Sequence, residues 1–312
     1  MRAAKLIDVN WNTDACSTAS SADFEKEAYK LLKDGKNGRL SWKIGEYDTC
    51  GEGKECKKLE RSYKTSMVAH VALEPMSALV NFDNGVLHIY AGHQVGTLLP
   101  NIIGQFTGIS SDKIIYHPHL VGGSFGKRTE FGMIALASMA SIQLKKPIKL
   151  ILTREDDMAF SHPRTPTVQR LEAVISGEEC LGYKQEIASA TMQFDKLMPQ
   201  FLRNPIVDGV PVESENKIEG FTVVGADNWY DIENQTVNYF RQASVEDTIP
   251  VRNVRSVGNN YTVFATETFI DEVSQEIGVD PMAFRLNYLN GVGINAGSNT
   301  PASYGGGKRL AN

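Results

Sequence analysis

Three glycines and a phenylalanine stand close together in V-G-G-S-F-G-K-R, residues 121–128. An apolar strand pattern at residues 113–117 precedes this segment, and apolar residues at helical spacing follow it at residues 131–144. Glycine lets the backbone approach a ligand closely, and a glycine turn that opens a helix presents unpaired N–H groups to an anion. A tight turn without a ligand is an equal alternative for the segment taken alone.

Other residues with catalytic or metal-binding chemistry form weaker patterns. The sequence has no G-x-S-x-G, H-E-x-x-H, Walker or G-x-G-x-x-G motif. His117 and His119 form an H-x-H pair on one strand face, but Pro118 and the missing third ligand favour a structural role over a zinc site. Asp156 and Asp157 follow a strand and suit a helix start, with a metal or ribose contact as the lesser alternative.

The composition is that of an ordinary globular protein. The 312 residues are enough for about two domains, and 42% are hydrophobic and 22% charged. The net charge of −5 and the lack of a long basic run argue against a nucleic-acid partner. No window approaches ~18 continuous apolar residues, so we expect no transmembrane segment. The first residues also lack the apolar core of a signal peptide.

Four cysteines do not make a disulfide framework in a chain of this size. Cys50 and Cys56 enclose G-E-G-K-E and could form a small bridge, a metal pair or neither. Free thiols are the favoured interpretation, because metal sites usually show C-x-x-C pairs or nearby histidines. Cys16 and Cys180 are isolated in the sequence.

The elements that must position the glycine-rich segment mix strands and helices without strict βαβ alternation. Strands are expected at residues 4–11, 59–67, 86–90, 113–117 and 148–152, with a hairpin formed by 167–175 and 181–191. Helices are expected at residues 22–33 (capped by Ser21), 97–106, 131–144, 261–277 and 281–289. This mixture predicts an α+β fold of mixed sheets with packed helices.

The domain organisation follows from two polar stretches. Residues 36–57 are polar and glycine-bearing and are expected to be a linker, so that an N-terminal strand–helix segment with this linker spans 1–57 and the main domain spans 58–312. Residues 192–234 show turn signals and little periodicity. Residues 291–312 are rich in Gly, Asn and Ser and end without a closing element, which predicts a chain cut inside a longer protein.

Several segments become specific through their joint order. They are H-V-A-L-E-P-M-S at 70–77, A-G-H-Q at 91–94, the glycine-rich segment, K-P-I-K-L-I-L-T-R-E-D-D-M at 146–158, and R-S-V-G at 255–258 before a helix containing E-T-F-I-D-E. In spacing and sequence the chain resembles the molybdenum-binding subunit of the xanthine oxidase/aldehyde oxidase family, in particular the large (beta) subunits of isoquinoline 1-oxidoreductase and related aldehyde dehydrogenases. The resemblance covers nearly the whole chain.

This resemblance implies a bacterial molybdopterin-dependent oxidoreductase, periplasmic or cytoplasmic. The full-length enzyme would bind molybdenum as molybdopterin cytosine dinucleotide and oxidise an N-heterocycle or an aldehyde with oxygen drawn from water. The 2Fe-2S clusters need cysteine-rich ligand sets, so they would lie in a small iron–sulfur partner subunit. The chain would be the first half of the cofactor-binding region, completed by the remainder of the large subunit. Alone, it is expected to be inactive and to hold neither molybdenum nor pterin.

The site residues carry over from the family's motifs. Gln94 matches a glutamine whose side-chain amide approaches an oxygen ligand of molybdenum, and a polar strand-end residue is its alternative. The glycine loop beside the metal would offer backbone amides to the oxygen ligands, with an aromatic ring bordering the substrate. The matching loop residues are Gly122, Gly123, Phe125 and Gly126. The resemblance therefore implies Gln94 and Phe125 as the catalytic residues of this chain.

Ser124 departs from the family's motif, Arg255 matches it, and one functional residue of the family has no match in this chain. Ser124 replaces the family's usual third glycine and adds a hydroxyl donor to the cofactor loop. Arg255 matches an arginine before the long helix, whose fork of donors suits an anionic cofactor, with an ordinary salt bridge as the alternative. The family's general-base glutamate aligns with nothing here. Glu130 and Glu267 are expected to lie in helices with surface or packing roles.

Two other functions remain open. A nucleotide-dependent oxidoreductase would use V-G-G-S-F-G as a phosphate loop and Glu155 or Asp156 as the ribose acceptor, although the glycine spacing counts against it. A non-catalytic binding module would dock a partner on the helix at residues 261–277.

Overall fold

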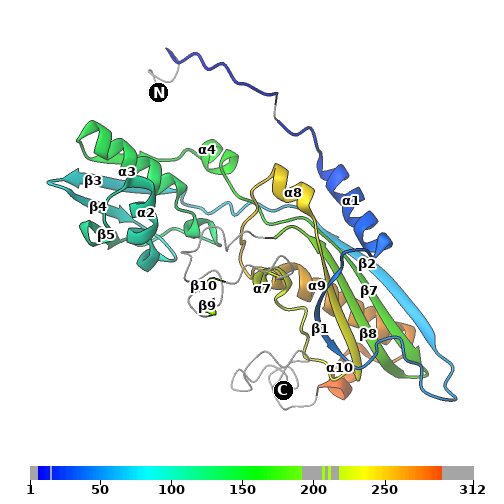
Figure 1. Ribbon diagram of the computed structural model, residues 1–312. Helices are drawn as coiled ribbons and strands as arrows, with labels where there is room; N and C mark the ends of the chain where they lie inside the picture. The colour runs from blue at the N-terminus through cyan, green and yellow to red at the C-terminus, as the bar shows by residue number, and fades with distance from the viewer. Residues whose placement is uncertain (1–5, 15, 192–205, 208–209, 212–217, 290–312) are drawn as a thin grey trace.

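The computed structural model describes residues 6–14, 16–191, 206–207, 210–211 and 218–289. The described residues form two lobes, each built on a mixed sheet with packed helices (Figure 1). The expected α+β fold class is therefore confirmed. No described helix has the length and apolar character needed to cross a membrane.

The small lobe is a four-stranded sheet with helices on one face. Its strand order is β5-β4-β3-β6, and only β4 and β5 pair in parallel. The strands are β3 (Ser77–Asp83), β4 (Val86–Ala91), β5 (Ile114–Pro118) and β6 (Ile148–Ile151). The core lies between this sheet and the helices α2 (Leu99–Thr107) and α3 (Gly132–Leu144). Alternation along β4 turns Leu87 and Ile89 into the core and His88 and Tyr90 to the other face.

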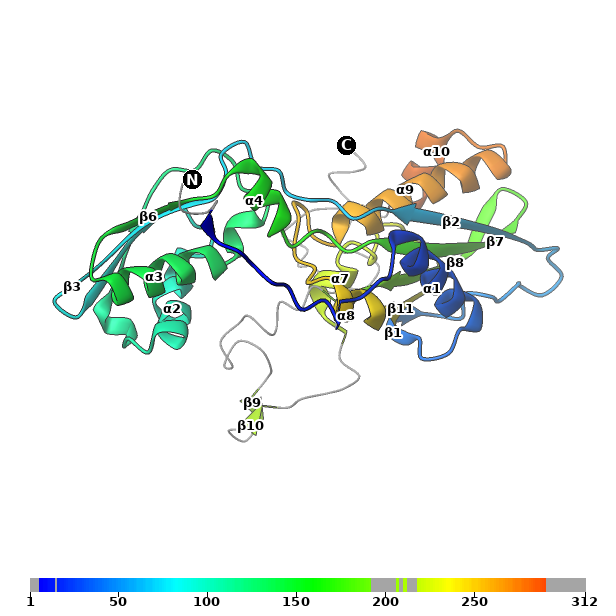
Figure 2. The same ribbon diagram turned by 90° about the horizontal axis from the view of Figure 1, so that it is seen from above.

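The large lobe is a five-stranded sheet between helices. Its order is β1-β11-β8-β7-β2, with β11 and β8 parallel and the other pairs antiparallel. The strands are β1 (Arg39–Ile44), β2 (Lys57–Thr65), β7 (Thr167–Ser176), β8 (Glu179–Ser189) and β11 (Asn234–Arg241). Helix α1 (Ser21–Asp34) packs on one face, whereas α9 (Asn259–Glu276) and α10 (Pro281–Tyr288) pack on the other (Figure 2).

Shorter elements connect these layers. They are α4 (Arg154–Ala159), α7 (Gly220–Val223), α8 (Ala243–Thr248), the 3₁₀ turns η2 (Gly96–Leu98), η3 (Ser111–Lys113) and η4 (Lys127–Thr129), and the strand pair β9 (Ile206–Val207) and β10 (Val210–Pro211). The whole small lobe is inserted between β2 and β7, and the two connecting segments touch where Val68 bridges Arg164.

Most expected elements exist within a few residues of their predicted bounds. The expected strand at 4–11 is wrong for its described part, because residues 6–11 are exposed and pair with no described strand. The expected linker at 36–57 contains β1, whose partner β11 lies about two hundred residues away in sequence. The N-cap of α1 is Ser20 rather than Ser21, since Ser20 and Asp23 form a reciprocal capping box. Most of the irregular stretch at 192–234 and all of 291–312 lie outside the described residues.

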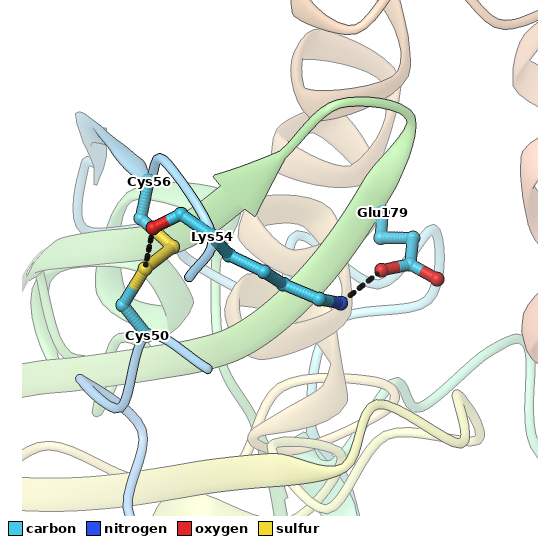
Figure 3. Close-up of a disulfide and its surroundings, with 4 residues drawn as sticks. All are labelled: Cys50, Lys54, Cys56 and Glu179. Atoms are coloured by element: carbon cyan, nitrogen blue, oxygen red, sulfur yellow. Dashed lines mark hydrogen bonds and ion pairs between the residues drawn. A yellow bond between two sulfur atoms is a disulfide. The ribbon is translucent and has the colours of Figure 1, made fainter. Parts of the chain in front are cut away.

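The free-thiol interpretation of Cys50 and Cys56 is also wrong. The two residues form a disulfide, with their Cα atoms 6.0 Å apart (Figure 3). Lys54, inside the closed loop, donates from Nζ to Glu179 Oε2 at 2.6 Å and so ties the loop to the start of β8. Cys180 is buried, and burial raises the pKa of its thiol to about 12. The division of the chain at residue 57 stays a prediction.

Candidate functional site

Gln94 and the glycine-rich loop at residues 122–126 lie together at one end of the small lobe. Both segments follow strands that pair in parallel, Gln94 after β4 and the loop after β5. Parallel neighbours end at the same edge of a sheet, so the segments that follow them meet there. His119 N–H continues the pairing to Ala91 O at 3.1 Å. The structure thus brings together residues that are 28–32 positions apart in sequence.

Gln94 is held through one end of its side-chain amide. Its Oε1 accepts hydrogen bonds from the Ser124 hydroxyl and from Gly126 N–H, the latter at 3.1 Å. Because a backbone N–H can only donate, the acceptor must be the amide oxygen. No described residue accepts a hydrogen bond from Gln94 Nε2, and the side chain is exposed. A fixed group with two free donors therefore faces outward.

The loop backbone adds further donors beside Gln94. Among the described residues, nothing accepts from the N–H groups of Gly123, Ser124 or Phe125. Positive φ angles at Gly123 (97°), Phe125 (54°) and Gly126 (104°) bend this stretch out of regular structure. Successive N–H groups in such a turn form a concave anion-binding arrangement. The loop and Gln94 together present a surface suited to oxygen atoms of a ligand.

Two of the glycines are required by packing within the protein. A Cβ at Gly126 would lie 2.1 Å from Asn253 O, and one at Gly122 would lie 2.6 Å from Glu74 Cβ. Gly122 also donates its N–H to Glu74 Oε2 at 2.5 Å. A Cβ at Gly123 would meet nothing closer than 3.5 Å, so its requirement is the positive φ. The tight-turn explanation therefore accounts for the glycines, while the unpaired N–H groups are what indicate a ligand.

Arg128 fixes the loop from behind and was missed by sequence reasoning. It is 1% exposed, donates to Gly123 O at 3.1 Å and Glu74 O at 3.2 Å, and pairs with the Glu74 carboxylate at 2.9 Å. A buried charge is tolerated only when it is paired and hydrogen-bonded in this way. A lysine–arginine pair after a glycine turn usually lies in solvent. The local sequence therefore gave no sign that Arg128 is buried.

Arg255 reaches the same loop from the large lobe. Its N–H donates to Phe125 O at 2.8 Å, its side chain is exposed, and no described residue pairs with its guanidinium. Phe125 is 40% exposed, so its ring is available at the loop surface. Non-glycine residues with positive φ gather here, at Val71, Phe125, Ser256 and Val257. Such strain persists where surrounding contacts enforce it, and it is commonest at functional sites.

His93 stabilises the turn that contains Gln94. Burial lowers the pKa of His93 to about 4, so the ring is neutral at pH 7. Its Nδ1 accepts from Val95 N–H at 3.2 Å, which leaves Nε2–H to point at Glu130 O at 3.4 Å. Its ring also packs 4.7 Å from that of Phe131, measured between centroids. His93 is therefore a supporting residue, with both nitrogens occupied.

The two glutamates considered as substitutes for the general base are both held by other residues. Glu130 precedes α3 rather than lying in a helix, and it is buried against Lys127 at 2.9 Å. Glu267 lies in α9 and accepts from Arg285 and Tyr230 at 3.0 and 2.7 Å. The expectation of helical placement is thus wrong for Glu130. The absence of the general base from this chain stays a prediction.

The candidate metal ligands His117, Asp156 and Asp157 have structural explanations. His117 stacks on Tyr90 with ring centroids 4.2 Å apart and lies 3.1 Å from His88, measured between nitrogens. Within the described residues no group of three metal-ligating side chains occurs. Asp156 and Asp157 begin α4 as expected, capped by Thr153.

Sequence comparison relates the chain to known proteins. A family model described as the molybdopterin cofactor-binding domain matches residues 32–181. The chain is 30% identical over 312 residues to the membrane-bound aldehyde dehydrogenase [pyrroloquinoline-quinone] of Gluconacetobacter polyoxogenes, covering 100% of this chain and 39% of the relative. It is 26% identical to isoquinoline 1-oxidoreductase subunit beta of Brevundimonas diminuta, covering 92% and 36%.

Solved structures share the fold. Quinoline 2-oxidoreductase from Pseudomonas putida 86 superimposes with a TM-score of 0.66 at 16% identity, covering 92% of this chain and 35% of that one. Aldehyde oxidoreductase from Desulfovibrio gigas gives 0.64 at 16% identity, covering 80% and 26%. The chain thus spans well under half the length of these relatives. It belongs to the molybdopterin cofactor-binding large subunits of the xanthine dehydrogenase and aldehyde oxidoreductase family, and it comprises part of such a subunit.

Proposed function

We propose that this chain forms one wall of the molybdenum-cofactor site in a hydroxylase that oxidises an N-heterocycle or an aldehyde with oxygen drawn from water. The observation that supports this most strongly is the state of Gln94. Its oxygen is held by Ser124 and Gly126, while its amide donors face outward beside the free N–H groups of residues 123–125.

These residues fit an oxygen-rich, anionic cofactor. When bound, the molybdenum cofactor supplies the oxidising centre that accepts electrons from the substrate carbon. Gln94 Nε2 and the loop N–H groups would donate to oxygen atoms of the bound group, already aimed because their other contacts are satisfied. Phe125 would border the substrate and exclude water. Arg255 would bind an anionic portion of the cofactor, since its guanidinium is exposed beside the loop.

The finer parts of this proposal concern the whole enzyme. Molybdopterin cytosine dinucleotide is the proposed form of the cofactor, held jointly by residues 58–312 and the remainder of the large subunit. The 2Fe-2S clusters are proposed for a small partner subunit, which would carry electrons away. A glutamate outside this chain would be the general base.

The test uses the whole protein that carries this chain, purified and analysed for molybdenum, pterin, pyrroloquinoline quinone and bound NAD. Stoichiometric molybdenum and pterin are expected. Bound NAD would instead support the nucleotide-dependent alternative, quinone without molybdenum would support quinone chemistry, and no cofactor would support a binding module.

Replacement of Gln94 then tests the site itself. Gln94→Ala should keep most of the molybdenum, because one hydrogen bond contributes only ~0.5–1.5 kcal/mol to a ligand held by many contacts. Turnover per molybdenum should fall by about 10²–10³, as for a donor aimed at charge that develops in the transition state. Gln105→Ala, an exposed glutamine on α2, is the matched control and should change neither quantity. Normal turnover per molybdenum in Gln94→Ala would remove this residue from the site.

A further inference from the structure

A buried ionic cluster lies directly behind the glycine-rich loop, outside the surface that would meet the cofactor. The Lys127 ammonium lies 2.9 Å from Glu130 Oε2 and donates to Phe160 O at 3.2 Å. His162 Nδ1 lies 3.0 Å from the same Oε2. The side chains of Lys127 and Glu130 are only 3% and 11% exposed. Three segments, at residues 127, 130 and 160–162, therefore meet at one carboxylate.

The carboxylate is ionised despite its burial. Burial acts to raise the pKa of Glu130, but His162 and Lys127 stabilise the charged form and bring the pKa below its ordinary value. A buried pair of this kind adds little stability compared with apolar residues, whereas removing one partner leaves an uncompensated charge. A gain in stability therefore does not explain why this position carries a charge. The neighbouring contacts indicate a role in holding the loop in place.

The cluster is continuous with the turn that carries Gln94. Gln94 N–H donates to Arg128 O at 2.9 Å, and His93 Nε2 lies 3.4 Å from Glu130 O. The backbone from 126 to 130 is closed by Thr129 N–H to Gly126 O and Glu130 N–H to Lys127 O, both at 3.1 Å. Anything that fixes Lys127 and Glu130 therefore also fixes Gln94 and the free N–H groups of the loop.

The cluster also lies where the two lobes join. His70 Nε2 lies 2.6 Å from Asn253 O, and Gly126 packs against that same carbonyl. Arg252 N–H donates to Pro163 O at 2.9 Å, immediately after His162. Residues 252–255 of the large lobe thus contact the loop on one side and the segment holding the cluster on the other.

We propose that Glu130 is a positioning residue, which with Lys127 and His162 locks the glycine-rich loop and the Gln94 turn against the junction of the two lobes. The expected effect of Glu130 on catalysis rests on the proposed function, whereas its effect on the structure of the loop does not. Its structural consequence involves only residues of this chain. Without the carboxylate the loop is less firmly held, and the hydrogen-bonded amides that close it and the Gln94 turn exchange more readily with solvent.

Hydrogen–deuterium exchange of the whole protein that carries this chain tests the structural consequence. In Glu130→Gln, the hydrogen-bonded amides of residues 94, 95, 126, 127, 129 and 130 should exchange about tenfold faster or more, as expected for loss of a buried charge-assisted hydrogen bond. Amides of β7 and β8 should be unchanged. Glu155→Gln, an exposed carboxylate on α4, is the matched control and should leave the loop as in the unaltered chain.

A second variant separates positioning from burial of charge. Lys127→Met combined with Glu130→Gln removes both charges, so the unfolding free energy should recover relative to Glu130→Gln alone. Loop exchange should stay fast, because the pairing of Glu130 with His162 is not restored and the bond from Lys127 to Phe160 O is lost as well. Loop exchange at the unaltered rate in the double variant would overturn the proposal, as would unaltered exchange in Glu130→Gln. The double variant keeps the test decisive if the single variant does not fold.

In the whole enzyme, the double variant should show lower kcat per molybdenum at unaltered molybdenum content and nearly unaltered KM. Fast loop exchange with unaltered kcat would refute the catalytic consequence. A whole protein without molybdenum would instead contradict the proposed function, and the exchange result would then stand separately.

Discussion

The disulfide between Cys50 and Cys56 predicts a measurable loss of stability when both residues are replaced by serine. The bridge closes a loop with a sequence separation of 6. In the chain-entropy model, a closed loop of about 7 residues destabilises the unfolded state by about 2.4 kcal/mol at 25 °C. The ion pair of Lys54 with Glu179 is exposed on both sides and adds little, so the free energy of unfolding should fall by about 2 kcal/mol.

The loss should be confined to the large lobe. The loop follows β1 and precedes β2, and Tyr47 within this connection lies under the Lys184 ammonium, 5.0 Å from the ring centroid. Urea unfolding of the Cys50→Ser/Cys56→Ser chain should therefore shift the transition seen by tryptophan fluorescence, since Trp42 lies in β1 and Trp229 shortly precedes β11 of the same sheet. Hydrogen exchange of β3 and β4, in the small lobe, should not change.

Two results would refute this reasoning. One is an unaltered unfolding free energy in the double variant, with Cys16→Ser, at an exposed free cysteine, as the control. The other is alkylation of all four cysteines in the unfolded, unreduced chain, since the bridge should protect two of them. Added reductant should lower the stability of the unaltered chain to that of the variant.

Two further predictions concern the site. Ser124→Ala removes one of the two donors that hold Gln94 Oε1, and turnover per molybdenum in the whole enzyme should fall about two- to tenfold at normal metal content, as expected for one hydrogen bond. Equal turnover would show that Gly126 N–H alone orients the amide. Because burial lowers the pKa of His93 to about 4, against about 6.5 when unfolded, the unfolded chain takes up the proton first. The stability this histidine contributes is complete above about pH 6.5 and is lost as the pH falls towards 4. The thermal unfolding temperature of His93→Gln should therefore decline less steeply over this pH range than that of the unaltered chain. An equal decline in the two proteins would contradict the assignment.

Local features of the sequence predicted the small lobe well. The strand at 86–90 and the helix at 131–144 show clear periodicity, and each forms within a few residues of its expected bounds. The meeting of Gln94 with the loop was implied by the family resemblance, because local periodicity does not show that β4 and β5 pair in parallel. The resemblance of ordered motifs to the family supplied the chemical meaning, which periodicity alone does not contain.

Features that depend on distant partners could not be predicted from the sequence. Strand β1 has an irregular burial pattern and becomes a strand because β11 lies beside it. Arg128 can be buried because the Glu74 carboxylate, more than fifty residues earlier in sequence, forms an ion pair with its guanidinium. The sequence also could not single out the disulfide, since the spacing of Cys50 and Cys56 suits a bridge, a metal pair or free thiols alike.

The insertion of the small lobe between β2 and β7 sets an order in which the protein can fold during synthesis. Thr65 and Thr167 face each other on these paired strands, with hydroxyl oxygens 2.9 Å apart, and residues 66–166 lie between them. At roughly 5–20 residues per second, β2 waits about 5–20 s on the ribosome before its partner emerges, while the small lobe can already collapse around its own core. A strand left unpaired for so long risks joining another chain. The sequence of β2, K-K-L-E-R-S-Y-K-T, is dense in charge, which disfavours such aggregation both then and later, when β2 forms an edge of the sheet as the described residues build it.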